Sequence, residues 1–430
     1  MRRLLLAVAF VLVVLPKSPA RAITATIDNV PAATLLFPYF EIDLGNAGGV
    51  NTLIAIQNAS ASAGLMNVTL WTDLGIPTLS FNIYFTGFDT QTINLRDVLV
   101  NGVVPRTASA GQDPTDTISP HGPISQDINF ASCNVDPDDL GGGDDGPLGP
   151  FLPPLIPLLT PAQIADLQRA HTGQSSTSGS FGIAAGQCAG TVHADNIARG
   201  YVTADSVTQC ATLNPRSPGY FTGVADHRNI WLGDVFYVRP GANLMEADIA
   251  VPVESALGFP SPGPLPSSYT FYGRMPSVNF NSSDQREPLA SAWAASFLNF
   301  ATDLVVWRDP TTDVAPFPCG SPAGDPYPLQ QTQAVAFDTE ENPRVLSGSL
   351  LPVAAQRTPV GPPPMSIPGE KAGWLFLNLN SSTGFMGAFR QSWVQVLRTP
   401  EAPPVMTTGW SAVQLGSAAT GDNPTVGPPP

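Results

Sequence analysis

Histidine is the side chain best suited to proton transfer near neutral pH, because its ordinary pKa is about 6.5. The chain has four, which are His121, His171, His193 and His227. They lie far apart and show neither an H-E-x-x-H motif nor another paired spacing that binds zinc. We therefore expect ordinary surface or turn histidines. His193 is the strongest candidate for a functional role, because Asp195 and Arg199 follow it closely.

Nucleophilic catalysis finds no support among the sequence motifs. The chain has no G-x-S-x-G elbow and no S-x-x-K motif, and Lys371 is its only lysine beyond the first 22 residues. No glycine-rich phosphate loop follows a strand and opens a helix. The common serine-hydrolase mechanism and nucleotide cofactors are therefore not expected.

Carboxylates remain as candidate catalytic groups. A glycosidase needs two of them about 5 to 9 Å apart, one with a pKa raised by burial. The residues that could supply such a pair are Asp73, Asp89, Asp234, Glu287 and Asp309. Nothing in the sequence selects two of them, so the catalytic residues stay unknown.

An acidic segment, residues 136–145, carries five carboxylates within ten residues. Oxygen ligands on a glycine-rich loop suit calcium, and Asp136, Asp138 and Asp144 are the candidate ligands. Leu140, however, stands where an EF-hand requires Asp or Asn. A solvated acidic linker is the expected structure, and no metal or cofactor is expected elsewhere.

Arginines and tryptophans each allow two interpretations. Arg199, Arg274 and Arg308 lie in strand-like apolar runs, and Arg286 precedes Glu287. Structural ion pairs with nearby Asp or Glu are the expected role, and contacts with a ligand are the alternative. The tryptophans could stack on sugars, although five of them lie in apolar runs typical of a core. The seven are Trp71, Trp231, Trp293, Trp307, Trp374, Trp393 and Trp410.

Residues 1–22 have the pattern of a cleavable signal peptide. Two arginines precede the twelve-residue apolar run Leu4–Leu15, and Ala20-Arg21-Ala22 is a small-x-small cleavage site. Twelve apolar residues are too few to span a bilayer, which needs roughly twenty. No later run is long enough, so we expect an exported chain that begins at Ile23 and has no transmembrane segment.

The charge balance excludes some partners. Removal of the first 22 residues leaves 15 basic residues against 34 acidic ones, a net charge of −19. Nucleic acid and anionic membranes are therefore not expected to bind. Charged residues make up only 12% of the chain, against about 25% in an average domain, so Ser, Thr, Asn and Gln must supply much of the surface polarity.

The four cysteines, Cys133, Cys188, Cys210 and Cys319, all lie in the exported part. An even number in an oxidising compartment indicates two disulfides. Of the three connectivities, we favour Cys188 with Cys210 and Cys133 with Cys319, because the first pair closes a short loop. The cysteines lack the C-x-x-C spacing of a structural zinc site.

The exported chain has an all-β pattern, with short apolar and β-branched runs between turns rich in its 46 Pro and 39 Gly residues. Alternation is clear in 67–72 and 79–85, which predicts half-buried antiparallel strands. The expected architecture is two antiparallel β-sandwich domains, Ig-like or jelly-roll-like, at 23–133 and 190–416.

The domains are expected to be joined by an insert, residues 134–189, and followed by a disordered tail, 417–430. The insert should hold one short helix, 161–171, because Thr160 and Gln163 form a capping box and Pro161 takes the first helical position. Trp71-Thr72-Asp73 and Trp307-Arg308-Asp309 each close a strand, so a duplication of the two domains is a hypothesis. Coincidence among short β motifs is the alternative.

Five runs together resemble a group of uncharacterised secreted bacterial proteins. They are Leu36-Phe37-Pro38-Tyr39-Phe40-Glu41, Trp71-Thr72-Asp73, Thr107-Ala108-Ser109-Ala110-Gly111, Asn196-Ile197-Ala198-Arg199-Gly200-Tyr201 and Val306-Trp307-Arg308-Asp309. The resemblance covers most of the exported chain and implies export, with no activity or site.

The sequence predicts an extracytoplasmic protein, secreted or at the cell surface, with a binding or structural role and a surface protein or glycan as partner. A secreted hydrolase that acts on a polysaccharide or ester through a carboxylate-based site is the alternative. A pocket with convergent carboxylates or a His/Asp pair would favour the hydrolase.

Overall fold

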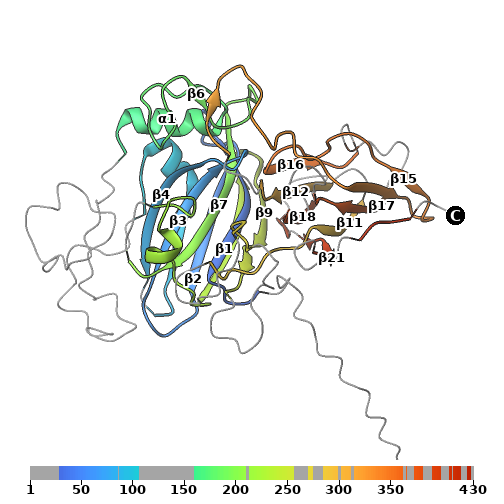
Figure 1. Ribbon diagram of the computed structural model, residues 1–430, viewed down its shortest axis with the longest axis horizontal. Helices are drawn as coiled ribbons and strands as arrows, with labels where there is room; N and C mark the ends of the chain where they lie inside the picture. The colour runs from blue at the N-terminus through green and yellow to red at the C-terminus, as the bar shows by residue number, and fades with distance from the viewer. Residues whose placement is uncertain are drawn as a thin grey trace, which may run out of the picture.

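The structure is a computed structural model. It describes residues 29–85, 87–105, 159–209, 213–255, 270–274, 284–298, 302–310, 314–361, 365, 372–380, 390–398, 406–408, 410–417 and 424–427. The expected signal peptide, the acidic segment 136–145 and two cysteines, Cys133 and Cys210, lie outside the described residues. Four large sheets dominate, so the prediction of an all-β fold is confirmed (Figure 1).

Two five-stranded sheets form the first sandwich. In sheet I the strand order is β10 (Val251–Val253), β1 (Thr34–Asp43), β7 (Ile197–Val207), β3 (Gly64–Thr72) and β4 (Pro77–Phe85). In sheet II it is β19 (Met406–Thr408), β9 (Leu244–Ile249), β8 (Trp231–Arg239), β2 (Asn51–Asn58) and β5 (Thr90–Asn94). Neighbouring strands are antiparallel, except that β19 runs parallel to β9.

Large apolar side chains fill the space between sheets I and II. The rings of Phe85 in β4 and Trp231 in β8 lie 4.8 Å apart between centroids. The hydroxyl of Tyr237 in β8 donates a hydrogen bond of 3.1 Å to the carbonyl oxygen of Tyr39 in β1. Burial of such rings is the main source of stability for a sandwich with few charges.

The second sandwich pairs sheet III with sheet IV. Sheet III has the order β15 (Pro343–Val345), β14 (Gln333–Phe337), β17 (Ala372–Asn378), β11 (Ala292–Leu298) and β21 (Val413–Gly416). Sheet IV has the order β16 (Ala355–Pro359), β12 (Thr302–Arg308), β18 (Ser392–Arg398) and β20 (Trp410–Ser411).

Trp293 of β11 and Trp393 of β18 meet between these sheets at 5.1 Å. The indole nitrogen of Trp293 also donates to the hydroxyl of Ser392 at 2.9 Å. A helical period also fits the residues around Trp293, but the structure places β11 there.

Sheets I and II draw strands from both sides of the insert. Strands β7 to β10 follow the insert, yet β7 pairs with β1 and β3, and β8 pairs with β2. The expected domain limits, 23–133 and 190–416, therefore do not follow the sheets. One continuous core cluster runs from β1 in the first sandwich to β18 in the second.

Strands β3 and β4 are buried on both faces, although their alternating pattern predicts half-buried strands. Polar side chains on the second face bond to one another across the pair. Thr69 and Ser80 lie 3.0 Å apart between hydroxyl oxygens, and Asn67 donates to Asn82 at 3.3 Å. Burial of these groups costs little free energy because each has a hydrogen-bond partner.

The predicted helix is confirmed as α1 (Pro161–His171). Thr160 accepts a hydrogen bond from the backbone of Gln163 at 3.3 Å, and the Gln163 side chain accepts one from the Thr160 backbone at 2.9 Å. Gly173 follows with a φ of +70°, a left-handed conformation that glycine adopts readily. Leu167 is fully buried, and α1 covers one end of the first sandwich (Figure 1).

Short helical turns and a small sheet complete the described elements. They are the π-helical turns η1 (Asp97–Asn101) and η3 (Tyr220–Val224), the 3-10 turn η4 (Pro240–Ala242), and the pair β6 (Gln187–Cys188) and β13 (Phe317–Pro318). Residues 270–274 contain no strand, although 269–273 has a strand-like composition.

The serine-rich loop after α1 wraps around one carboxylate. Asp166 accepts hydrogen bonds from the backbone nitrogens of Thr177, Ser178 and Ser180 at 2.7, 3.0 and 3.2 Å. Although burial opposes it, these bonds and those from the Ser178 and Thr177 hydroxyls hold the pKa of Asp166 well below its usual range. The composition of 174–182 predicts mobility, whereas the structure shows a hydrogen-bonded loop.

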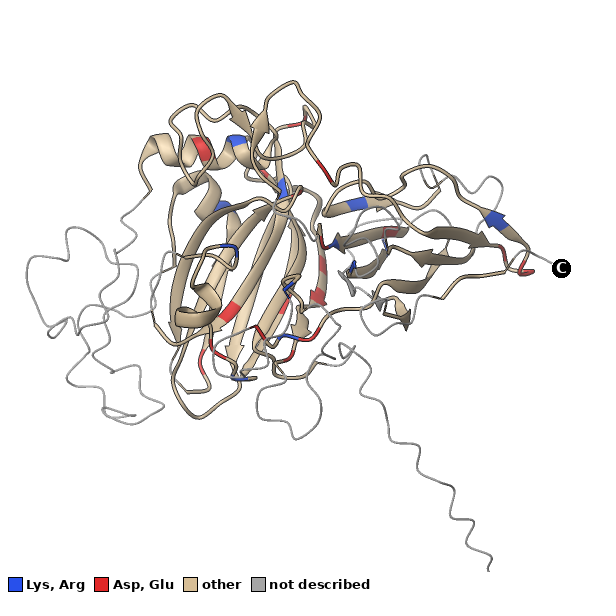
Figure 2. Cartoon of the chain, in the orientation of Figure 1, with Lys and Arg blue, Asp and Glu red and all other residues tan. Residues whose placement is uncertain are grey.

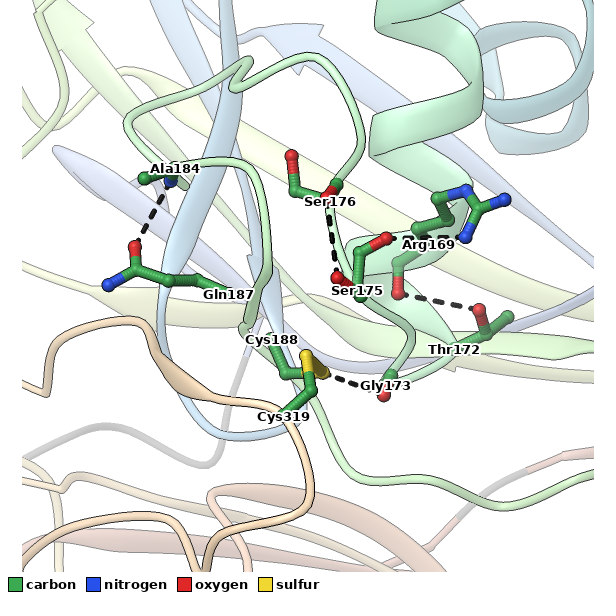
Figure 3. Close-up of a disulfide and its surroundings, with 9 residues drawn as sticks. All are labelled: Arg169, Thr172, Gly173, Ser175, Ser176, Ala184, Gln187, Cys188 and Cys319. Carbon is green, nitrogen blue, oxygen red and sulfur yellow. Dashed lines mark hydrogen bonds between the residues drawn. A yellow bond between two sulfur atoms is a disulfide. The ribbon is translucent and has the colours of Figure 1, made fainter.

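A disulfide joins Cys188 to Cys319 (Figure 3). The predicted pairings of Cys188 with Cys210 and of Cys133 with Cys319 are therefore both wrong. The pairing of β6 with β13 brings Cys188 and Cys319 to a Cα separation of 5.1 Å across 131 residues of sequence. The bond ties the loop after α1 to the segment that leads into sheet III.

The disulfide leads to a first prediction. Of the four cysteines, this bond leaves Cys133 and Cys210 as the only candidates for a second intramolecular pair. Peptide mapping under non-reducing conditions should recover the pairs 188–319 and 133–210. Replacing both Cys188 and Cys319 by Ser should lower the free energy of unfolding by about 4 kcal/mol, because the bond closes a long loop. Recovery of a 188–210 peptide would contradict the structure.

Candidate functional site

One His/Asp pair forms among the residues that the sequence singles out. Nε2 of His193 lies 3.2 Å from Oδ2 of Asp73. The Asp73 side chain is 3% exposed, whereas that of His193 is 34% exposed. Asp195 instead bonds to Arg199, with 2.8 Å between Oδ1 and Nη1. The partner of His193 is thus 120 residues away in sequence, and not its close neighbour.

Asp73 holds three segments together at the turn between β3 and β4. Its Oδ1 accepts a hydrogen bond of 3.0 Å from the backbone of Thr191, beside the disulfide. Its carbonyl oxygen accepts bonds of 2.8 and 3.1 Å from the backbones of Ala354 and Ala355 at the start of β16. Through its carboxylate and its backbone carbonyl, Asp73 therefore joins sheet I, the α1 region and sheet IV.

A His–Asp pair could orient an imidazole as a general base for a nucleophile. Among the residues that the structure describes, no hydroxyl or thiol lies within hydrogen-bonding distance of His193. The geometry therefore indicates that the pair positions the 188–193 segment on the β3–β4 turn.

The other described histidines are separate from this pair. His171 is buried, 2.9 Å from the hydroxyl of Thr78 and 3.0 Å from the carbonyl oxygen of Arg199. Burial lowers the pKa of His171 to about 4, so this imidazole is neutral at pH 7. Burial and Arg286 lower the pKa of His227 to about 4. His121 lies outside the described residues.

The five candidate carboxylates stand on five separate elements. Asp73 is in the β3–β4 turn, Asp89 precedes β5 and Asp234 lies in β8, while Glu287 precedes β11 and Asp309 follows β12. Burial raises the pKa of Glu287, and the nearby Glu254 raises it further. Burial also raises the pKa of Asp234.

Arg286 confirms the structural interpretation, with partners other than its neighbour Glu287. Its side chain is fully buried, with Nε 3.3 Å from Asp205 and Nη1 3.6 Å from Asp284. The hydroxyls of Tyr220 and Tyr272 each donate to Asp205 at 2.8 Å. A guanidinium with two buried carboxylates belongs to the core, since no ligand can reach it.

Arg308 departs from the expected pairing with Asp or Glu. Its Nη atoms donate to backbone carbonyls, including those of Leu351 at 2.6 Å and Leu379 at 2.7 Å. Burial lowers the pKa of Arg308, and the nearby Arg390 adds to that effect. Arg308 therefore ties together chain segments of the second sandwich.

The densest ion-pair network lies between the two sandwiches and centres on Arg357 of β16. Its Nη1 lies 2.8 Å from Glu246 of β9 and 3.3 Å from Glu41 of β1, and its Nε lies 2.7 Å from Asp303 of β12. Arg357 is 7% exposed and Glu246 1% exposed. Burial disfavours the cation, but Glu41, Glu246 and Asp303 outweigh it and raise the pKa of Arg357. The boundary carries acidic and basic positions in Figure 2.

Asp248, two residues beyond Glu246 in β9, has a different environment. Its Oδ2 is buried and has no hydrogen-bond partner among the described residues. Burial, helped by the charge of Asp234, raises the pKa of Asp248 to about 6, although a bond from the backbone of Ile249 opposes both effects. This carboxyl therefore titrates above its ordinary pKa of about 3.9.

The two Trp-x-Asp motifs meet around one ring. The rings of Trp71 and Tyr201 are stacked, with 5.6 Å between their centroids. The ring of Trp307 meets that of Tyr201 edge to face, with 6.0 Å between centroids. Both tryptophans are 3% exposed and belong to the core. Their meeting does not test the duplication, which stays a hypothesis.

Sequence reasoning missed the outer face of sheet III, where Trp374 stands partly exposed. Its ring stacks on Phe337 of the neighbouring strand, with 4.0 Å between centroids and 5° between planes. The other tryptophans with a described burial, at 71, 231, 293, 307 and 393, are buried. The prediction that five tryptophans are core residues is therefore confirmed.

A row of apolar residues crosses all five strands of this sheet. Residues directly opposite one another on paired strands point to the same face. The successive partners are Val345, Val335, Phe376, Ala294 and Val413. Val345 is 69% exposed and Val413 is 60% exposed, at the two ends of the row. We call this surface the sheet III face.

Other expected features are absent from the described residues. There, no group of three or more His, Cys, Asp or Glu residues is placed to hold a metal ion. No helix in the described segments has the length and hydropathy to cross a membrane. The calcium candidates Asp136, Asp138 and Asp144 lie outside these segments.

A second prediction concerns Arg357. Arg357→Met should lower the free energy of unfolding by about 3 kcal/mol at pH 7, because it leaves Glu246 buried without a counter-charge. The matched control is Arg344→Met on exposed β15, which should change it by less than about 0.5 kcal/mol. Denaturant unfolding measures both, and equal effects would contradict a central role for Arg357.

A third prediction concerns Asp248. A carboxyl with a raised folded-state pKa contributes stability that is complete below pH 4 and lost as the pH rises through about 6. Asp248→Asn should therefore raise the free energy of unfolding by about 2 kcal/mol at pH 7.5 and change it little at pH 4. Exposed Glu340→Gln is the control. If the free energy of unfolding of the Asp248→Asn variant and of the unaltered chain changed with pH in parallel, the raised pKa of Asp248 would be refuted.

Comparisons of the chain with protein-family models, with curated proteins and with solved structures find no match. The function must therefore be inferred from the geometry of this chain alone.

Proposed function

We propose that the protein is an exported binding protein that holds a surface protein on the sheet III face. The observation that carries the proposal is the continuous apolar row across five strands, exposed at both ends by Val345 and Val413. Exposed apolar side chains that share one face of a sheet mark an interaction site, because leaving them in water costs free energy.

Further exposed residues enlarge this surface. Leu298, the last residue of β11, is 43% exposed, and Leu415, on the edge strand β21, is 40% exposed. Trp374 adds a partly exposed indole, and aromatic side chains dominate the energetics of protein interfaces. The row contains no charged residue, so binding a partner here would not require the removal of water from ions of this row.

Export is part of the proposal and rests on the N-terminal sequence pattern. The disulfide between Cys188 and Cys319 supports it, because such bonds persist in oxidising compartments. The residues that form the predicted signal lie outside the described part, so their evidence is the sequence alone.

The alternative, a secreted hydrolase, has weaker support. Its best observation is the pair His193 and Asp73, but both Asp73 side-chain oxygens and its carbonyl already bond to His193, Thr191 and the start of β16. The buried carboxylates Glu246 and Asp205 neutralise Arg357 and Arg286. The geometry therefore favours structural roles for these groups.

The fourth prediction tests the binding proposal on intact exporting cells. A photo-crosslinking phenylalanine replaces Val413 on the sheet III face, or Val192, which is 67% exposed but lies beside the disulfide. A protein adduct of defined mass should form at position 413 and not at 192. It should fade when Val345, at the other end of the row, becomes Asp. The recovered protein should begin at Ile23.

Adducts that form equally at both positions, or at neither, would contradict binding through this face. Retention of the unaltered protein on surface polysaccharide, lost in Trp374→Ala, would instead assign a glycan as the partner.

A further inference from the structure

We infer that the sheet III face is a peptide-binding site, that its partner is an extended segment that carries a branched aliphatic residue, and that the chain's own C-terminal segment occupies it. This inference rests on the proposed binding function and specifies the chemistry of the partner. The occupying segment, here called the tail segment, is Pro424-Thr425-Val426-Gly427.

Gln333, the first residue of β14, recognises the backbone of the tail segment. Its side-chain amide nitrogen donates a hydrogen bond of 2.9 Å to the carbonyl oxygen of Val426. Its side-chain amide oxygen accepts one of 2.8 Å from the Val426 backbone nitrogen. One primary amide thus satisfies both backbone groups of one residue. Such recognition is independent of the side chain and is typical of extended-peptide binding.

Asn378, the last residue of β17, makes the second backbone contact. It is fully buried, and its side-chain amide nitrogen donates a hydrogen bond of 2.7 Å to the carbonyl oxygen of Pro424. Gln333 and Asn378 are direct partners across β14 and β17, so both point to the same face. The buried Asn378 side chain therefore binds the backbone of the tail segment directly.

The side chain of Val426 supplies the apolar part of the contact. It packs against a cluster of Val335, Phe337 and Phe376, with Trp374 beside it. Val335 and Phe376 are each only 3% exposed, although they belong to the outward row. The tail segment therefore covers the middle of the row and leaves Val345 and Val413 exposed at its ends.

The sequence predicts a disordered tail over residues 417–430. The described residues 424–427 are instead hydrogen-bonded to the sheet. Such a segment competes with any partner of the same chemistry. Only residues 417–423 separate it from β21 in the sequence, so it acts at an effective concentration in the millimolar range. A partner must therefore displace it, which makes the tail segment an autoinhibitory ligand.

The fifth prediction uses the chain truncated after Ser417 and a fluorescent peptide of residues 421–430. The truncated protein should bind this peptide with a dissociation constant below about 1 mM, since weaker binding would not hold the tail in place. The full chain should bind it at least about tenfold more weakly, because its own tail competes. Fluorescence anisotropy measures both affinities, and emission from Trp374 should change on truncation.

Variants separate the site from the rest of the sheet. In the truncated protein, Gln333→Ala should weaken binding about tenfold, as should Val426→Asp in the peptide, because each removes one named contact. Val192→Ser, an exposed aliphatic residue beside the disulfide and outside the sheet III face, is the matched control and should leave the affinity unchanged. Circular dichroism verifies that each variant is folded.

Binding of the peptide that is equally strong with Gln333→Ala, or absent from the truncated protein, would overturn the inference. Those results leave the proposed function standing if position 413 still crosslinks to a partner on cells. Peptide binding without any crosslink would support the tail contact and contradict the cellular binding role.

Discussion

The contact of Arg357 with Glu41, Glu246 and Asp303 fixes how the two sandwiches meet. Each acid comes from a different strand, with β1 and β9 in the first sandwich and β12 in the second. Placing these charges in a poorly hydrated boundary is costly unless they are paired closely, so only a narrow set of orientations is stable. Asp73 reinforces that orientation by accepting two backbone bonds from the start of β16.

The scarcity of charge in this chain gives each charged group a defined place. Arg286 and Arg357 neutralise carboxylates inside the protein, while Arg308 is bound by backbone carbonyls. The buried polar faces of β3 and β4 use Asn, Thr and Ser pairs instead of ions. Most strands are therefore uncharged in Figure 2, and solubility depends on loops and on uncharged polar side chains. Such a chain leaves apolar sheet surface where a more charged protein would carry ions.

Local patterns predicted the local structure well. The Thr160–Gln163 capping box specified α1, and the alternating runs 67–72 and 79–85 marked β3 and β4, because both signals act over a few residues. Contacts between distant segments had no such signal. His193 and Asp73 were separate candidates whose pairing spans 120 residues, and the short loop between Cys188 and Cys210 favoured the wrong disulfide. Arg357 showed nothing in its sequence context, since its acids come from three other strands.

The sheet III face shows why strand patterns alone conceal a binding surface. The sequence does not distinguish the outward apolar residues of sheet III from core residues, because an apolar residue in a strand looks the same in sequence whichever face it is on. These residues are Val335, Phe337, Trp374 and Phe376. Only the cross-strand register reveals that they share the face turned away from Trp293 and sheet IV. The junction between the sandwiches, where a hydrolase would be sought, is filled by Arg357 and its acids. The function is therefore best sought on the uncharged outer face that the tail segment already covers.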